Sequence, residues 1–170
     1  MRDVPADGGP MGEVVMRGNN VMRGYFEDPE ATVEAFEGGW FHSGDLGVVH
    51  PDGYIELRDR KKDIIISGGE NIASVEIEKV IQDHSAVFEV VVIGVPDEQW
   101  GEAVKAIVVL QPGAEASPED IIAYAKTQIA GFKVPKSIDY IDVLPRNPSG
   151  KVLRRELRAP YWEGRERNVN

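Results

Sequence analysis

The 170-residue chain contains no cysteine, which excludes a disulfide framework, a thiolate nucleophile and a cysteine-ligated metal. Folding must therefore rest on the hydrophobic core. No apolar run approaches the roughly 18 residues that a membrane-spanning helix needs. Basic residues are also fewer than acidic ones, so the formal net charge is −10 at pH 7. That balance argues against a general nucleic-acid-binding surface or an anionic-membrane surface.

Two further absences concern metals and targeting. The histidines His42, His50 and His84 do not have the spacing of metal ligands, so we predict no metal site. The N-terminus does not read as a signal peptide, and the last three residues are not the Ser-Lys-Leu peroxisomal address. We therefore expect a cytoplasmic protein.

Residues 1–61 read as a β-rich piece of a larger domain. We expect a strand over 13–17, a helix over 29–36 that begins with Asp28 as N-cap and Pro29 in its first turn, and a strand over 54–58. The segment Ser43-Gly44-Asp45 is expected to form a tight turn between two short strands.

Residues 62–158 read as a compact α+β domain of two helices against a small sheet. Alternating and β-branched runs predict strands at 64–66, 87–95, 103–110 and 138–143, with helices that begin at Ser74 and Ser117. Few apolar residues follow Pro160, so we expect the tail, 159–170, to be loosely docked or disordered.

The run 145–151, Pro-Arg-Asn-Pro-Ser-Gly-Lys, places Lys151 on a stiff loop. Pro145 and Pro148 fix φ and donate no backbone N–H, while Gly150 tolerates positive φ. The pattern after Lys151 predicts a helix whose N-terminus lies near the ammonium, where an anion would be stabilised. On this loop alone, an ordinary solvated lysine is the simpler interpretation.

Two further segments accompany this loop: 39–47, Gly-Trp-Phe-His-Ser-Gly-Asp-Leu-Gly, and 59–72, which begins Asp-Arg-Lys-Lys-Asp and contains Ser-Gly-Gly-Glu-Asn. In this order the three segments resemble the adenylate-forming acyl-CoA synthetases of the AMP-binding superfamily. The likeness runs from about Gly12 to Leu157, which is nearly the whole chain.

The resemblance implies roles for three positions in the first two segments. Asp45 is expected to bind both hydroxyls of the ATP or AMP ribose, although an Asp beside Gly commonly serves its own turn. Arg60 is expected to contact the nucleotide, and Lys62 to be the hinge about which the C-terminal domain rotates. The neighbouring Arg58 and Lys61, like Arg154 and Arg155, are interpreted as solvated charge.

The resemblance also implies that Ser67, Gly68 and Gly69 line the passage for the thiol arm of CoA, although these residues read equally well as a strand-to-helix turn. Trp100 could stack on the CoA adenine, but a core or interface tryptophan is the simpler interpretation. Lys151 is the expected catalytic residue, stabilising the transition state while a carboxylate attacks the α-phosphorus of ATP.

The fold class implied is an α+β C-terminal domain, resembling a small α/β sandwich, preceded by the last β-rich piece of a large N-terminal domain that this chain lacks. The substrates would be ATP with Mg²⁺, CoA and a fatty or aromatic carboxylic acid. The family's phosphate loop is absent from the sequence, so we expect the chain alone to be inactive. A long-chain acid would imply peripheral membrane association.

Three alternatives stay open. Luciferase-like enzymes and carrier-protein-loading adenylation domains share these motifs, and the fragment could keep the fold only as a non-catalytic interaction module.

Overall fold

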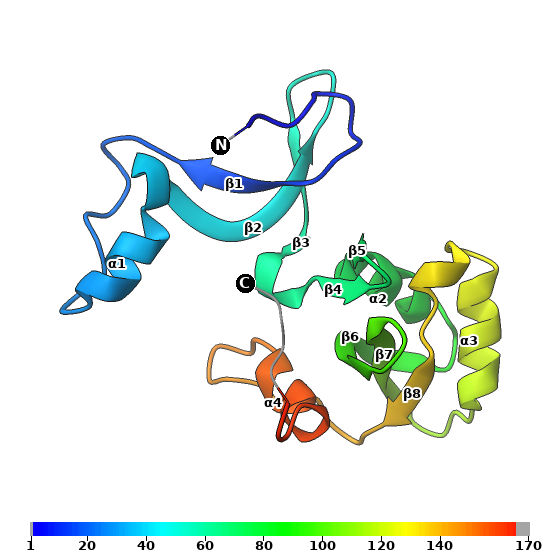
Figure 1. Cartoon of the computed structure of the whole chain (residues 1–170). Helices are drawn as coiled ribbons and strands as arrows, with labels where there is room; N and C mark the ends of the chain where they lie inside the picture. The colour runs from blue at the N-terminus through cyan, green and yellow to red at the C-terminus, as the bar shows by residue number, and fades with distance from the viewer. Residues whose placement is uncertain (1, 166–170) are drawn as a thin grey trace. The chain divides into compact units, whose positions relative to one another are not determined.

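The computed structural model describes residues 2–165, and the chain divides at Lys62 into two compact units (Figure 1). The first unit comprises Met1–Lys62 and the second Asp63–Asn170. Each unit is described by itself.

The first unit is a three-stranded antiparallel sheet in the order β1-β2-β3, formed by Gly12–Met16, Phe41–Val49 and Ile55–Arg60. Helix α1, Pro29–Ala35, precedes β2, with the 3₁₀ turn Glu37–Gly39 between them. The predicted N-cap is confirmed, because the Asp28 side chain accepts a hydrogen bond of 2.9 Å from the Ala31 N–H. The hairpin after β2 turns through the residues 51–53.

The predicted turn at Ser43-Gly44-Asp45 is wrong, because these residues lie inside the continuous strand β2. The pairing of β1 with β2 is irregular there: the register runs from Glu13 opposite Leu46 to Val15 opposite His42. Three residues of β2 therefore face a single residue of β1, which is a bulge. Gly44 adopts a φ of 73°, a conformation that glycine accepts at little cost.

The second unit is a five-stranded sheet whose path runs β5-β4-β7-β6, with β8 paired to β7. Its strands are β4 Ile65–Ser67, β5 Glu70–Ile72, β6 Val87–Asp97, β7 Gly101–Leu110 and β8 Ser137–Tyr140. Only the β7–β8 pairing is parallel among the strand pairs of residues 2–165. The helices are α2 Ser74–Gln82, α3 Pro118–Lys126 and α4 Arg154–Arg158, and 3₁₀ turns occupy Lys61–Asp63, Gly131–Lys133 and Ala159–Tyr161.

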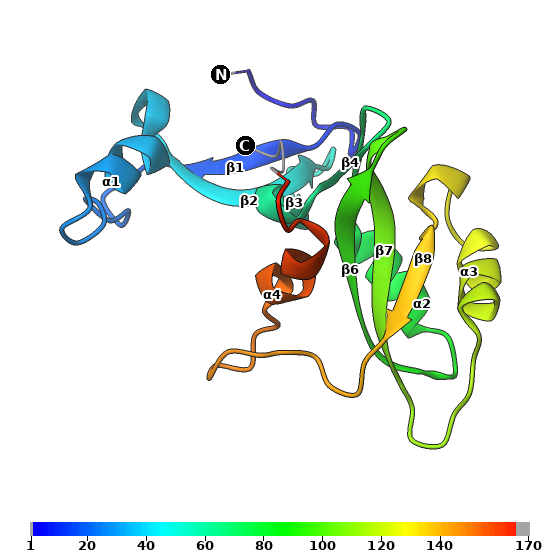
Figure 2. The same cartoon turned by 60° about the horizontal axis from the view of Figure 1, so that its bottom comes forward.

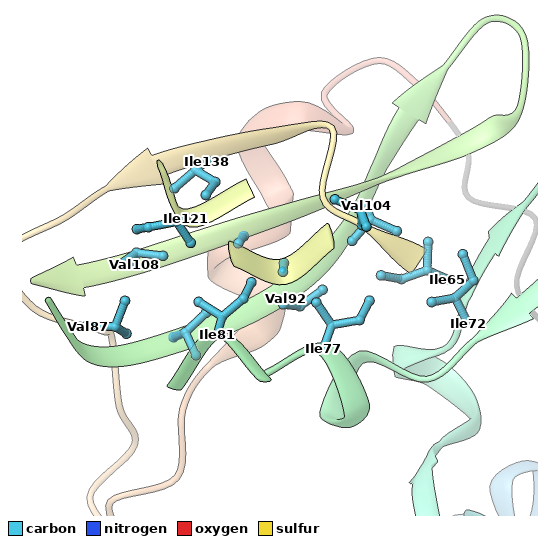
Figure 3. Close-up of a cluster of buried hydrophobic side chains, with 14 residues drawn as sticks. Ile65, Ile72, Ile77, Ile81, Val87, Val92, Val104, Val108, Ile121 and Ile138 are labelled. Carbon is cyan, nitrogen blue, oxygen red and sulfur yellow. The ribbon is translucent and has the colours of Figure 1, made fainter. Parts of the chain in front are cut away.

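The core of the second unit has two layers because β6 alternates its side chains between the faces of the sheet. Val90 and Val92 join a cluster with α2 and α3 (Figure 3). Val91, Ile93 and Val95 face the other way and pack with the segment around α4, which lies across the sheet from α2 and α3 (Figure 2). The α+β fold class is confirmed, with α4 as a third helix.

Local sequence explains the start of α3, whereas two other predicted boundaries differ from those observed. Helix α3 begins with a capping box, in which Ser117 and Asp120 satisfy each other's backbone N–H groups. The helix predicted directly after Lys151 instead begins at Arg154, three residues later. The strand predicted over 138–143 ends at Tyr140.

The segment 67–71 is not the strand-to-helix turn that was the alternative prediction, because Gly68 and Gly69 connect β4 to β5 in a β-hairpin. Their φ values are 60° and 86°. Two consecutive positive φ values are what a two-residue type I′ hairpin loop requires, and glycine supplies them.

The tail contacts the sheet of the second unit through Tyr161 and Trp162. The Trp162 indole N–H donates to the Gly94 carbonyl of β6 at 3.0 Å, and the Tyr161 hydroxyl donates to Asp139. Burial and that hydrogen bond raise the pKa of Tyr161 to about 12, so the hydroxyl remains a donor at neutral pH. The expectation of loose docking is therefore wrong for Tyr161 and Trp162. Residues 166–170, to which the expectation also applied, lie outside the described residues.

Candidate functional site

The structure brings together the two residues predicted to bind the nucleotide. Asp45 lies at the end of the bulge in β2 and pairs in register with Arg60, the last residue of β3. The Arg60 Nε lies 3.3 Å from the Asp45 Oδ1. Both side chains remain open to solvent, with 35% of Asp45 and 57% of Arg60 exposed, so a ligand can approach the pair.

The bulge is held by Glu13, a residue that sequence reasoning did not single out. Its carboxylate accepts a hydrogen bond of 3.1 Å from the Gly44 N–H, contacts the His42 Nδ1 at 2.9 Å and pairs with the Lys61 ammonium at 3.6 Å. Lys61 is therefore paired as well as solvated. The Glu13 contacts span about thirty residues of sequence, so no local pattern indicated them.

These contacts shift two pKa values. Burial raises the pKa of Glu13, but the His42 hydrogen bond, the Lys61 charge and the Gly44 N–H outweigh burial, and the net pKa is lowered. The hydrogen bond that His42 donates to the Glu13 carboxylate raises the pKa of His42. Each partner therefore favours the charged form of the other.

Lys62 lies in the 3₁₀ turn Lys61–Asp63, where the first unit ends. The structure thus places a short turn, rather than the interior of a strand or a long helix, at the predicted hinge. Its motion remains a prediction.

Gly68 of the β4–β5 hairpin lies directly under Trp100. The Gly68 N–H donates to the Trp100 carbonyl at 2.9 Å, and a Cβ at position 68 would lie 2.8 Å from the Trp100 ring. Ser67 pairs with Gly101 of β7 beside this contact. Trp100 is 47% exposed, so it is not a core residue, and its role at an interface stays a prediction.

Gly69 differs from Gly68 in having open space where its Cβ would be. The two adjacent glycines thus share the requirement for positive φ but only one is in close contact with a neighbouring side chain.

Lys151 lies at the end of a loop whose two ends are joined by hydrogen bonds. Arg146 and Val152 form an isolated antiparallel bridge, the Asn147 N–H donates to the Lys151 carbonyl at 2.9 Å, and the Asn147 side chain accepts from the Lys151 N–H at 2.8 Å. The residue is exposed, and within residues 2–165 its ammonium forms no hydrogen bond or ion pair. The backbone is therefore fixed, while the charge stays available to an external anion.

Arg154 is the second important residue that sequence reasoning missed, since it was interpreted as solvated charge. Its side chain is only 21% exposed. It contacts the Glu78 carboxylate of α2 through two nitrogens, at 2.7 and 2.9 Å, and donates to the Val92 carbonyl of β6 at 2.9 Å. No local motif reveals contacts that span 62 and 76 residues of sequence.

The comparisons with known proteins agree with this geometry. Residues 76–151 match the family model described as the AMP-binding enzyme C-terminal domain. The matched segment runs from α2 to Lys151 and so includes most of the second unit. Residues 76–151 of this chain thus match the C-terminal domain of AMP-binding enzymes.

Two curated relatives resemble nearly the whole chain. An acetate–CoA ligase from Humulus lupulus is 53% identical over 96% of this chain and 29% of the relative. A fatty acid–[acyl-carrier-protein] ligase from Streptomyces coeruleorubidus is 47% identical over 99% of this chain and 32% of the relative. The chain thus spans about a third of the length of the relatives it matches.

Among solved structures, ATP-bound MatB from Rhodopseudomonas palustris superimposes with a TM-score of 0.84 at 39% identity. The likeness covers 91% of this chain and 31% of that protein. It therefore includes both units.

None of the helices within residues 2–165 is long and apolar enough to span a membrane. The same part of the chain holds no group of three or more histidine, aspartate or glutamate residues that could bind a metal ion.

Proposed function

We propose that this chain is the C-terminal part of an ATP-dependent acid–thiol ligase that works together with a larger N-terminal portion. In the first half-reaction a carboxylate oxygen of the acid attacks the α-phosphorus of ATP, which forms an acyl-adenylate and releases pyrophosphate. In the second half-reaction the CoA thiol attacks the acyl carbon, which forms the thioester and releases AMP.

The pairing of Asp45 with Arg60 is the observation that supports this function most strongly. An ionised carboxylate can accept hydrogen bonds from both hydroxyls of a ribose, and a guanidinium suits ribose or phosphate oxygens. The bulge in β2 and the register with β3 place both groups at one solvent-accessible position. We assign this pair to the nucleotide.

Lys151 is proposed as the catalytic residue of adenylation. Negative charge gathers on the phosphate oxygens during the attack, and a fixed cation stabilises it, an effect of about 10²–10³ in rate for single donors elsewhere. The closed loop fixes the Lys151 backbone, and its ammonium has no competing partner within residues 2–165.

The two half-reactions require different faces of the second unit at the same site. We propose that the unit rotates about Lys62, and that Ser67, Gly68 and Gly69 then line the CoA passage. The division of the chain at Lys62 supports the hinge. The hairpin supports the passage at Gly69, where open space lies at the Cβ position and no side chain would obstruct an extended thiol arm, whereas the Trp100 ring fills the corresponding space at Gly68.

The acid is proposed to be fatty or aromatic, since relatives of similar identity include a fatty acid ligase and a feruloyl-CoA synthase. CoA is the favoured acceptor because several relatives are named as CoA ligases. The carrier-protein ligase among them supports a carrier-bound thiol as the alternative acceptor. We assign no Mg²⁺ ligand to this chain, and propose that Mg²⁺ arrives on the phosphates of ATP.

A cytoplasmic location is proposed for the full-length protein on the basis of the acidic composition of this chain. One relative is named as a peroxisomal butyrate–CoA ligase, which makes the peroxisome the competing location. Imaging of the full-length protein tests this: co-localisation with a peroxisomal marker would contradict the proposal.

The function is tested by acid-dependent exchange of labelled pyrophosphate into ATP, followed by detection of the thioester. The full-length enzyme is expected to support exchange with a fatty or aromatic acid and to consume CoA, whereas this chain alone should show negligible exchange. Exchange followed by loading of a carrier protein only would favour the alternative acceptor. A full-length protein with no exchange across such acids would favour the interaction module.

A further inference from the structure

The segment that carries Lys151 is anchored to the residue that follows the proposed hinge. Arg154, three residues after Lys151, approaches Asp63 with its Nε 3.8 Å from the Oδ2. Arg158, one turn further along α4, donates to the Asp63 Oδ1 at 2.9 Å. Asp63 is the first residue of the second unit and directly follows Lys62.

The contacts of Arg154 extend from Asp63 to helix α2 and strand β6 of the second unit. Besides its paired contact with Glu78, Arg154 donates to the Val92 carbonyl at 2.9 Å and lies 3.2 Å from the Ser74 hydroxyl oxygen. The side chains of Asp63 and Glu78 are only 15% and 16% exposed. One guanidinium thus joins α4 to the first turn of the unit, to α2 and to β6.

From these contacts we propose that Arg154 is a positioning residue that fixes the Lys151 loop to the hinge end of the second unit. Rotation about Lys62 is then transmitted to Lys151 as movement of a rigid body. This inference rests on the proposed function, and assigns Arg154 a role in adenylation alone. Arg154 acts on the reaction only through the placement of Lys151.

The bidentate geometry explains why a lysine cannot replace Arg154. A guanidinium is a planar fork of five donors, whereas an ammonium is a point charge on a flexible stem. Arg154→Lys keeps the charge opposite Asp63 and Glu78, which favours folding, but it cannot reach Glu78 twice and the Val92 carbonyl together. The loop then loses its fixed position, and a misplacement of about 1 Å can cost about 10²-fold in rate.

The test is a double-mutant cycle in the full-length enzyme, with Arg154→Ala, Arg154→Lys and Lys151→Ala. Each Arg154 variant should lower kcat of pyrophosphate exchange about 10- to 100-fold, with KM for ATP nearly unchanged and thioester formation from supplied acyl-adenylate preserved. In the Lys151→Ala background the same substitutions should add little further loss, because Arg154 acts through Lys151. Arg155→Ala, the exposed neighbour, is the matched control and should retain exchange.

The outcomes separate this inference from the proposed function. If Lys151→Ala itself leaves exchange intact, the proposed role of Lys151 fails and the inference fails with it. If Lys151→Ala abolishes exchange but Arg154→Lys lowers both half-reactions equally, or adds its full loss to Lys151→Ala, then Arg154 is merely structural and only the inference is overturned. Arg154→Lys decides these outcomes should Arg154→Ala fail to fold.

Discussion

Asp45 and Arg60 form an ion pair across neighbouring strands, with the Arg60 Nε 3.3 Å from the Asp45 Oδ1. The sequence separates them by a complete hairpin, yet the register of β2 and β3 makes them direct partners. Because both side chains are substantially exposed, the pair itself should contribute little to stability, about 0.2–1 kcal/mol. Its conspicuous property is its accessibility to a ligand.

Asp45→Ala should therefore weaken ATP binding while leaving folding almost unchanged. In the full-length enzyme the loss should be about 1.5–3 kcal/mol for each charge-assisted hydrogen bond to the ribose. Isothermal titration with ATP measures the affinity, and urea unfolding measures stability. Asp52→Ala, which removes a carboxylate from the exposed turn between β2 and β3, is the control. Unchanged ATP affinity in folded Asp45→Ala would leave Asp45 as a structural residue of the bulge.

The hairpin between β4 and β5 offers a matched pair of glycine substitutions. Gly68→Ala and Gly69→Ala both place a side chain at positive φ, which costs about 1–2 kcal/mol. Only Gly68→Ala also forces a Cβ to within 2.8 Å of the Trp100 ring. We expect Gly68→Ala to be the more destabilising of the two in urea unfolding of this chain.

Removal of the ring supplies the control for this comparison. In a Trp100→Ala background the difference between Gly68→Ala and Gly69→Ala should shrink, since the contact no longer exists. A difference that persists unchanged would show that the Trp100 ring is not its cause.

The Glu13–His42 contact predicts a pH dependence for the stability of the first unit. The pKa of His42 is raised above its ordinary value of 6.5, so its stabilising contribution is complete below pH 6.5 and is lost as pH rises through the folded pKa. The pKa of Glu13 is lowered from 4.5, so its contribution is present above pH 4.5 and is lost as pH falls through the folded pKa.

The pair should therefore stabilise most between about pH 4.5 and 6.5, and both Glu13→Gln and His42→Gln should remove that maximum. Urea unfolding of this chain as a function of pH measures the effect. Glu13→Gln should remove the loss of stability at acid pH, whereas His42→Gln should keep part of it, because Lys61 and the Gly44 N–H still lower the pKa of Glu13. A wild-type profile that keeps its shape in both variants would show that the contact does not control it.

The hinge proposal predicts that Lys62→Pro separates the two half-reactions in the full-length enzyme. Proline fixes φ near −65° and restricts Lys61 toward extended conformations, so one domain arrangement should survive. Pyrophosphate exchange should be largely kept while thioester formation falls strongly. Lys62→Ala removes the ammonium but leaves the backbone free, and serves as the control. Parallel loss of both activities in Lys62→Pro, or no loss, would show that Lys62 is not the pivot.

The sequence predicted the elements whose signals are local. The N-caps Asp28 and Ser117, each followed by proline, specify the starts of α1 and α3 through hydrogen bonds within one turn. The β-branched runs also predicted strands β6 and β7, because a strand that is buried on both faces is apolar along most of its length. The motif residues Asp45 and Arg60 were also identified before their pairing was known.

The features that sequence reasoning missed depend on contacts distant in sequence. Gly44 was expected in a turn, since nothing near it shows that Glu13, about thirty residues earlier, supports a bulge instead. Strand β5 contains only three residues, too few to show alternation, whereas β4 begins one residue after the start of the strand predicted at 64–66. Arg154 reads as a surface charge until Glu78 and Val92 are brought beside it. Tyr161 and Trp162 are docked by Asp139 and the Gly94 carbonyl in the same way.

We propose that Lys151 stabilises the transition state of adenylation and has no role in the later thioester-forming step. Lys151→Ala should leave the loop closed, because the bonds to Asn147 come from the Lys151 backbone. Lys126→Ala, which removes an exposed lysine from α3, is the matched control.

The most direct measurement compares pyrophosphate exchange with thioester formation from supplied acyl-adenylate, on one folded preparation of full-length Lys151→Ala. We predict that pyrophosphate exchange falls about 10²–10³-fold in this variant, while thioester formation stays near the wild-type rate. Equal loss in both half-reactions, or full exchange without the ammonium, would contradict it.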